Sequence, residues 1–209
     1  MRLLAPPTSS DGPIDEERPV PLALRSCSRS DACANASTSG SLRRGPFQND
    51  EMHRVVANAM AETLAGNLQR TLREELGGTY GVSVQPSFTK RPTEEYQFTV
   101  SFACDPARTE SLVTAAFQVI ERFKTYGPSA GQVTDTRSAL VRDFETNSQR
   151  NDYLLNRILF KYEYGEDVRG IVNMRPFYDQ LTAPMLRDAA RAYLDTNRYV
   201  KVTLLPETR

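Results

Sequence analysis

Two side chains that could hold a peptide carbonyl, Arg73 and Tyr80, flank a pair of glycines, Gly77 and Gly78. Arginine offers a rigid fork of N–H donors to carbonyl or carboxylate oxygens, and a tyrosine hydroxyl offers one directed donor to a developing oxyanion. Spacing alone favours a plainer interpretation, in which Arg73 stabilises the C-terminus of a helix and Tyr80 is an ordinary strand aromatic. The neighbouring elements determine whether the two side chains can act together.

A long amphipathic helix is predicted before the glycines, over residues 50–76. Its apolar residues recur every four positions, and Asn49 and Asp50 are both good N-caps. The apolar positions are Val56, Met60, Leu64, Leu68, Leu72 and Leu76. The pair Gly77-Gly78 supplies the left-handed C-cap that commonly ends a helix, and it reverses the chain sharply. Arg73 therefore falls in the last helical turn, and Tyr80 begins the next element.

Two strands are predicted after the glycines. Apolar and polar residues alternate over residues 80–85 and 96–102, and the polar loop 89–95 joins them, which is typical of an antiparallel pair. The side chains expected on one side of the first strand are those of Tyr80, Val82 and Val84. This arrangement would place the arginine and the tyrosine at one edge of a sheet.

Helices and one further strand account for the remaining pattern. One helix opens after Asp105 and stops at Gly127, and Ser129 with Gln132 forms a capping box for a second helix. The apolar pattern of this second helix allows it to continue to Gly165. The elements predicted after it are a helix over residues 175–181, a helix capped by Thr182 and a final strand over residues 200–204.

These elements predict an α+β fold with two layers, a mostly antiparallel sheet with long helices packed on one face. Residues 1–44 are rich in Pro, Ser, Ala, Asp and Arg and show no sustained period, so we predict a disordered or non-homologous N-terminal segment. The folded domain is predicted over residues 45–207.

The composition argues against several classes of function. The 209 residues include 26 basic and 26 acidic ones, so no net field would attract nucleic acid or an anionic membrane. No apolar run approaches the roughly 18 residues of a membrane span, and the N-terminal apolar stretch is too short for a signal peptide. We expect a soluble protein, for which the sequence does not distinguish a periplasmic from a cytoplasmic location.

A self-contained zinc site is excluded by the histidine count. His53 is the one histidine of the chain, whereas a His-x-x-x-His or His-x-x-Glu-His site needs two on one helical face. Cys27, Cys33 and Cys104 do not form a metal-binding pattern. We expect His53 to be a partly exposed helix residue, and we predict no metal site or self-contained catalytic site in this chain.

The run Leu-Arg-Glu-Glu-Leu-Gly-Gly-Thr-Tyr-Gly-Val-Ser-Val, residues 72–84, resembles a known family signature. It is similar to the C-terminal, zinc-free domain of the pitrilysin and insulin-degrading-enzyme family of inverted zinc metallopeptidases, and most like the bacterial PQQ-linked zinc-protease branch. The similarity continues in the same order from Gly45, through the helix boundary at Gly127, to residues 202–207. It covers roughly three quarters of the chain, which is more specific than one motif.

The resemblance implies a two-part active site. A homologous domain or subunit carries His-x-x-Glu-His and the zinc, and residues matching Arg73 and Tyr80 hold the peptide and stabilise the tetrahedral intermediate. This chain would be the substrate-binding half of a metalloendopeptidase, inactive alone, with a peptide or unfolded polypeptide as its substrate. The alternative is a non-catalytic scaffold or peptide-binding subunit derived from the same fold.

The sequence departs from the family at its N-terminus. Such domains begin with strands ahead of the long helix, and here residues 1–44 take their place. We therefore expect a domain that lacks its first strands, as in a truncated or mis-started reading frame, and that exposes an unpaired sheet edge. A fragment that does not fold on its own is a third interpretation.

Overall fold

The structure is a computed structural model that describes residues 36–204, with the side chains of residues 45–204. The strands are β1 (Ala36–Pro46), β2 (Thr79–Thr89), β3 (Glu95–Cys104) and β4 (Tyr199–Leu204). The helices are α1 (Glu51–Gln69), α2 (Thr109–Tyr126), α3 (Ala130–Asn147), α4 (Asn151–Tyr164), α5 (Arg175–Asp179) and α6 (Ala183–Tyr193). Three short turns of other helix types complete them, η1 (Arg70–Glu75), η2 (Pro106–Arg108) and η3 (Val168–Val172).

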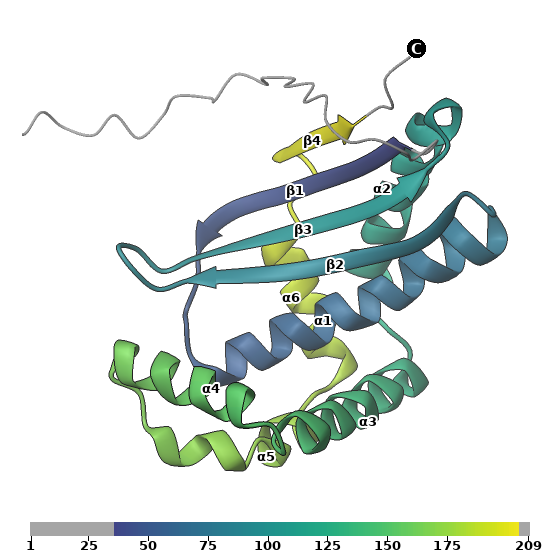
Figure 1. Cartoon of the computed structure of the whole chain (residues 1–209). Helices are drawn as coiled ribbons and strands as arrows, with labels where there is room; N and C mark the ends of the chain where they lie inside the picture. Colours follow the sequence, from purple (N-terminus) through teal and green to yellow (C-terminus); the bar gives the residue numbers. More distant parts are fainter. Residues whose placement is uncertain (1–35, 205–209) are drawn as a thin grey trace, which may run out of the picture.

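The strands form one antiparallel sheet in the order β2-β3-β1-β4. Helices α1, α2 and α6 lie against one face of this sheet, and α3, α4 and α5 lie on the far side of α1 from it (Figure 1). The predicted α+β class, an antiparallel sheet with helices on one face, is confirmed. The predicted antiparallel pairing of β2 with β3 is also confirmed.

Strand β1 lies between β3 and β4, within the segment predicted to be disordered. Its Ser- and Gly-rich sequence has a low strand propensity, but a central strand satisfies its backbone groups on both sides, and this pairing overrides the propensity. The prediction of disorder is therefore wrong for residues 36–44, and a strand does precede the long helix. Residues 1–35 lie outside the described residues.

The predicted apolar ridge, which runs along α1 into η1, forms the centre of the core. Met60, Leu64, Leu68 and Leu72 are all 0% exposed. Burial of each such side chain stabilises the fold by about 1.5–3 kcal/mol before conformational entropy is subtracted. The last member of the ridge, Leu76, is 42% exposed because the helix has already ended there.

Three predicted helix starts are confirmed by their caps. The Asp50 side chain accepts from the backbone N–H of His53 at 2.8 Å. Ser129 and Gln132 make both hydrogen bonds of the predicted capping box. The hydroxyl of Thr182 caps α6. Because each cap replaces a hydrogen bond that the first helical turn lacks, these short motifs could be recognised locally.

The sequence pattern allowed one continuous helix as far as Gly165, but the structure has two helices there. Helix α3 ends at Asn147, and α4 begins at Asn151 after a short turn. Gly165, with φ 66°, ends α4 in the left-handed conformation. Among its own residues α4 buries only Lys161. Helix α4 therefore lies at the border of the molecule rather than in its core (Figure 1).

Candidate functional site

The chain reverses between α1 and β2 through the π-helical segment η1. The backbone N–H of Leu76 donates to the carbonyl of Thr71, five residues earlier, at 3.1 Å, and that of Gly77 donates to the carbonyl of Arg73 at 2.9 Å. π-Helical turns are uncommon and often occur at functional sites. Gly77 has φ 57°, so the predicted left-handed residue at the helix end is confirmed.

Gly78 is required by packing rather than by backbone conformation. A Cβ at this position would overlap the side chain of Leu112, which is fully buried on α2. The backbone N–H of Gly78 also donates to the carbonyl of Leu72 at 2.9 Å. The two glycines therefore serve different purposes, because Gly77 allows the reversal and Gly78 allows α2 to approach it.

Two polar side chains hold this turn in place. Arg108 donates to the carbonyl of Leu76 at 2.7 Å and to that of Gly77 at 3.2 Å. Gln69 Oε1 accepts from the backbone N–H of Val82 at 3.1 Å. A cation suits these carbonyls, since the last carbonyls of a helix lack intrahelical partners. Sequence reasoning missed both residues because no local pattern indicates that Gln69 of α1 contacts β2 or that Arg108 of η2 contacts the turn.

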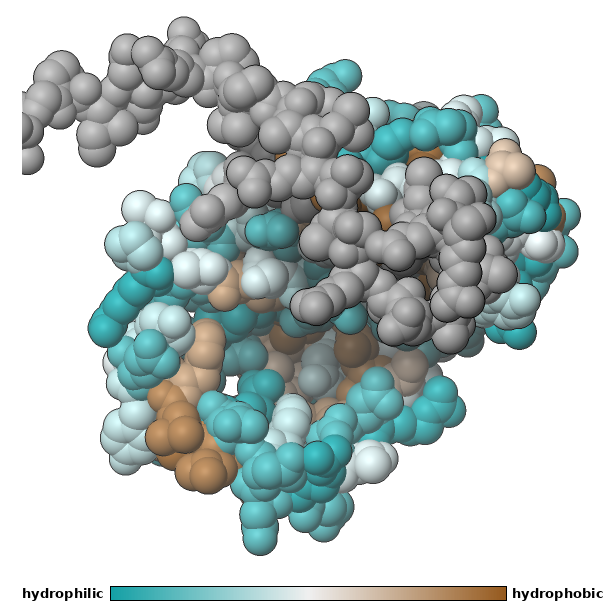
Figure 2. Space-filling model, turned by 45° about the horizontal axis from the view of Figure 1, so that its top comes forward, coloured by the Kyte–Doolittle hydropathy of each residue, from teal (hydrophilic) through white to brown (hydrophobic). Residues whose placement is uncertain are grey.

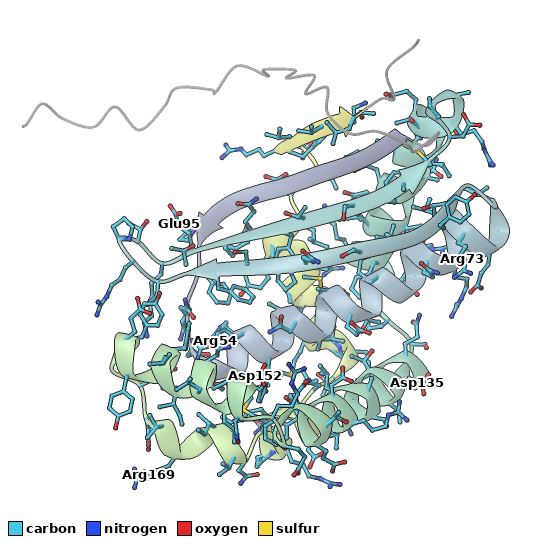
Figure 3. All side chains as sticks on the ribbon, viewed as in Figure 1. Arg54, Arg73, Glu95, Asp135, Asp152 and Arg169 are labelled. Carbon is cyan, nitrogen blue, oxygen red and sulfur yellow. The ribbon has the colours of Figure 1, made fainter. Side chains whose placement is uncertain are left out.

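Arg73 lies within η1, and its side chain is exposed. Figure 3 shows it at the opposite end of the long helix from Arg54. Its guanidinium forms no hydrogen bond or ion pair with any residue that the structure describes, although its backbone carbonyl is fixed by Gly77. The donors of Arg73 are therefore available to a ligand.

Tyr80 is 78% exposed at the start of β2. The expectation that it shares one side of the strand with Val82 and Val84 is wrong. One extra residue is inserted between Thr79 and Val82 relative to β3, and this β-bulge shifts the alternation of the side chains. The bulge leaves the phenol in solvent, whereas Val84 is buried.

The structure thus places Arg73 and Tyr80 at the two ends of one short connection, on the edge strand of the sheet. Both side chains are exposed, and the backbone between them is held by the contacts described above. A guanidinium fork and a phenol on one rigid turn can donate hydrogen bonds to a carbonyl oxygen or an oxyanion. Rigid backbone support is what such donors need to act without reorganisation.

Neither His53 nor any other described group forms a metal site. His53 Nδ1 lies 2.8 Å from Asp50 Oδ1, and its side chain is 41% exposed, as expected for a partly exposed helix residue. Within residues 36–204, no three His, Cys, Asp or Glu side chains are grouped to hold a metal ion. None of the helices in this range is long and apolar enough to cross a membrane.

The other end of α1 carries a group of charges that we call the ion cluster. Its members are Glu51, Arg54, Lys90, Arg157, Lys161 and Glu166. Arg54 Nη2 lies 2.8 Å from Glu166 Oε2 and 3.1 Å from Glu51 Oε2, and Lys161 pairs with both carboxylates. These ion pairs join α4 and the loop after β2 to the start of α1.

Both carboxylates of the ion cluster remain ionised. Burial of the Glu166 carboxyl opposes ionisation, but hydrogen bonds from Arg54, Lys161 and Lys90 outweigh it and hold its pKa well below the ordinary value. Burial and the same kind of partners act on Glu51, whose pKa is also lowered. Each of the four cations of the cluster is therefore paired within the chain, and together they share the two carboxylates. Sequence reasoning missed the cluster because its partners are about a hundred residues apart.

A cleft of about 700 Å³ lies between α1, the edge of β2 and helices α3 to α5. The molecular surface is hollowed, with hydrophobic residues at the base of the hollow (Figure 2). The ion cluster forms one end of the cleft, through Glu51, Arg54, Arg157 and Lys161. The volume lies within the range of roughly 300–1,000 Å³ that is usual for ligand sites.

Comparison with known families identifies the fold. Residues 42–140 match the family model described as the peptidase M16 inactive domain. The chain is homologous to the peptidase M16 inactive domains. The matched region contains Arg73, the two glycines and Tyr80, and the predicted resemblance to the zinc-free domain of this metallopeptidase family is confirmed.

A curated relative of this chain is the "Probable zinc protease PqqL" of Escherichia coli (strain K12), which is 24% identical over 156 residues. The alignment covers 74% of this chain but 16% of the relative. In the crystal structure of that periplasmic protease, the similar region has a TM-score of 0.70 at 21% identity and covers 95% of this chain and 22% of PqqL. The chain thus spans a small part of the relative's length.

Two further solved structures share the fold. The peptidase M16 inactive domain from Pseudomonas fluorescens has a TM-score of 0.68 at 18% identity, over 84% of this chain and 42% of that one. A protease from Helicobacter pylori has a TM-score of 0.71 at 15% identity, over 85% of this chain and 43% of that one. This chain therefore shares the fold of both structures and matches less than half of each of those two chains.

Proposed function

We propose that this M16 domain is the zinc-free half of a metallopeptidase, which binds the peptide substrate and completes the active site of a zinc-bearing partner domain. The observation that carries the proposal is the pair of exposed donors, Arg73 and Tyr80, on a turn whose backbone is fixed by Arg108 and Gln69. A polar side chain with a purely structural role would be expected to bond to the rest of the fold, and neither donor forms a side-chain hydrogen bond or ion pair with another described residue.

The two donors have complementary roles in this proposal. Arg73 binds the carbonyl oxygens of the peptide through its fork of N–H groups and fixes the register of the chain. Tyr80 donates its phenolic hydrogen to the oxygen that becomes negative as the scissile carbonyl turns tetrahedral. Because both start from rigid backbone, little reorganisation is needed at the moment of reaction.

The metal and the general base belong to the partner in this proposal. No described group of this chain can hold zinc, and the family resemblance implies a homologous domain with His-x-x-Glu-His. Zinc in that domain would supply an activated water, while this chain contributes substrate binding and oxyanion stabilisation. The partner is a domain of the same polypeptide or a separate subunit.

The direct test is reconstitution. The zinc-bearing M16 domain is purified, this chain is added in increasing amounts, and hydrolysis of an unstructured fluorogenic peptide is followed. We expect activity to rise with the added chain and to saturate. Loss of one transition-state donor should reduce kcat by on the order of 10²-fold, so both Arg73→Ala and Tyr80→Phe should abolish most of the stimulation. Unchanged turnover after mixing would contradict the proposal.

A second candidate function is that of a scaffold or peptide-binding subunit without a catalytic role. It is favoured by an apolar stripe on α4, where Leu155, Leu159 and Tyr162 are 55%, 56% and 73% exposed at helical spacing. Exposed stripes of this kind commonly mark protein interfaces. The scaffold function predicts stable association with a protein that lacks a zinc motif, unaffected by Arg73→Ala and weakened by Leu159→Glu in an analytical size-exclusion experiment.

A further inference from the structure

The cleft beside α1 lies next to the edge strand that begins with Tyr80. Its lining includes Asn58 and Glu62 from α1, and Val84 and Pro86 from β2. Asn58 and Glu62 lie one helical turn apart, and β2 forms one edge of the sheet. A chain bound at the turn could therefore continue over α1 and beside β2 into the cleft.

The strongest charges in the cleft are already engaged. Arg54, Arg157 and Lys161 are paired with carboxylates of the ion cluster, and Arg150 Nη2 lies 2.6 Å from Asp152 Oδ2. Glu62, in contrast, is exposed and has no ion-pair partner in the part of the chain that the structure describes. The cleft thus offers no unpaired cation to an acidic ligand, and a free carboxylate would repel one.

Three carboxamides in the cleft have unused hydrogen-bonding capacity. The side chains of Asn58, Asn147 and Asn156 line it from α1, α3 and α4, and none of them hydrogen-bonds to another described residue. A carboxamide both donates and accepts, which matches the alternating N–H and C=O groups of a peptide backbone. Tyr153 and Phe160 add aromatic surface beside them.

From these features we infer that the cleft is a second binding site for the substrate, which takes an extended, uncharged stretch of the peptide remote from the residue held by Arg73 and Tyr80. The inference rests on the proposed function, since it requires the substrate to be a peptide anchored at the turn. The three amides bind the backbone, and the aromatic side chains contact apolar side chains of the peptide.

The helix sets the expected spacing between the two sites. Glu62 is the cleft residue of α1 nearest to Arg73 in sequence, and eleven helical residues correspond to roughly 16 Å at 1.5 Å each. An extended peptide advances about 3.3 Å per residue, so about five residues separate the two sites. Peptides shorter than this reach the turn alone, and longer ones reach both.

Fluorescence anisotropy with the full chain tests the inference. Two labelled peptides of Ser, Thr, Gln and Leu are used, one of about four residues, which reaches the turn alone, and one of about fourteen, which spans both sites. We expect the longer peptide to bind the unaltered chain more tightly. The double variant Asn58→Leu with Asn156→Leu should weaken binding of the longer peptide by about tenfold and leave the shorter one unchanged. The control is Asn173→Leu, which alters an exposed asparagine outside the cleft.

A second variant, which fills the cleft, keeps the test valid if the double variant fails to fold. Asn156 is exposed on α4, so Asn156→Trp should fold normally by circular dichroism and still fill the cleft. We expect the same selective loss for the longer peptide. Equal binding of the two peptides by the unaltered chain, or unchanged binding of the longer one by both cleft variants, would overturn the inference. Neither result affects the reconstitution assay with Arg73→Ala, which separately tests the proposed function.

Discussion

An arginine lies near each end of the helical segment formed by α1 and η1, and the surroundings of the two arginines are opposite in character. Arg54 is buried and hydrogen-bonded to Glu51, Glu166 and Asn49, and it belongs to the cluster that joins distant parts of the chain. Arg73 is exposed, and its guanidinium forms no hydrogen bond or ion pair with another described residue, although the backbone that carries it is hydrogen-bonded. Figure 3 shows the two residues at opposite ends of the helix.

The comparison shows how a structural arginine differs from one whose donors are available to a ligand. Burying a guanidinium costs free energy unless its donors are hydrogen-bonded, so removing Arg54 or its partners should destabilise the fold. An exposed guanidinium on a rigid turn costs little, and its donors stay free for binding. Mutations at the two ends should therefore separate stability from activity.

The largest effect is expected at the buried end. Arg54→Ala leaves the carboxylates of Glu51 and Glu166 without their central partner, and breaking a buried ion pair from one side costs about 3–5 kcal/mol. The free energy of unfolding, measured by urea denaturation, should fall by about that amount. Arg70→Ala is the matched control, because Arg70 is exposed and should change stability by less than about 0.5 kcal/mol. Equal effects of the two variants would contradict the structural role of the ion cluster.

A smaller loss of stability is expected at the turn itself. Gly78→Ala introduces a methyl group that overlaps Leu112, and overpacking of this kind costs about 1–3 kcal/mol. Gly66→Ala, in the interior of α1 with open space around it, should instead stabilise the protein by about 0.5–1 kcal/mol. Thermal melts of both variants measure the contrast. If both substitutions shifted the melting temperature in the same direction, the close approach of α2 to the turn would be in doubt.

The ion cluster should also make stability depend on pH. The pKa of Glu166 is lowered in the folded state, so its contribution is complete above the ordinary value of 4.5 and is lost as pH falls through the folded pKa. Glu166→Gln should therefore destabilise the protein more at pH 7 than at pH 3, by roughly 1 kcal/mol. Urea titrations at the two pH values measure this difference. A difference that grew toward low pH would have the wrong sign.

The smallest effect on stability is expected for Arg73→Ala. Its side chain has no partner among the described residues, so the free energy of unfolding should change by less than about 0.5 kcal/mol. Urea denaturation beside Arg54→Ala makes the comparison direct. A loss above about 1 kcal/mol would support the plainer interpretation, in which Arg73 stabilises the C-terminus of the helix through its dipole.

Structural features that depend on residues a few positions apart could be predicted from the sequence. The leucine ridge of α1, the left-handed Gly77 and the capping box at Ser129 each depend on spacings of a few positions. The same local signal located Arg73 and Tyr80 at a helix end and a strand start. Periodicity and caps are local properties of a chain, so no knowledge of the tertiary fold was needed.

Features that depend on distant partners could not be predicted. Strand β1 forms because β3 and β4 supply its hydrogen bonds, and its own Ser- and Gly-rich sequence gives no sign of this. The bulge that exposes Tyr80 is set by the register against β3. Arg108 and Arg54 are ordinary charged residues in the sequence, and only the fold shows that one holds the turn and the other the ion cluster.

The most direct test of the proposed substrate-holding pair compares ground-state and transition-state binding in the reconstituted peptidase. Arg73→Ala and Tyr80→Phe are each assayed for kcat/KM and for inhibition by a phosphinic peptide, which mimics the tetrahedral intermediate. We predict that both variants lose affinity for the inhibitor by the same factor as kcat/KM, on the order of 10²-fold for each donor. Full inhibition and undiminished kcat/KM in both variants would show that this pair does not contact the reacting carbonyl.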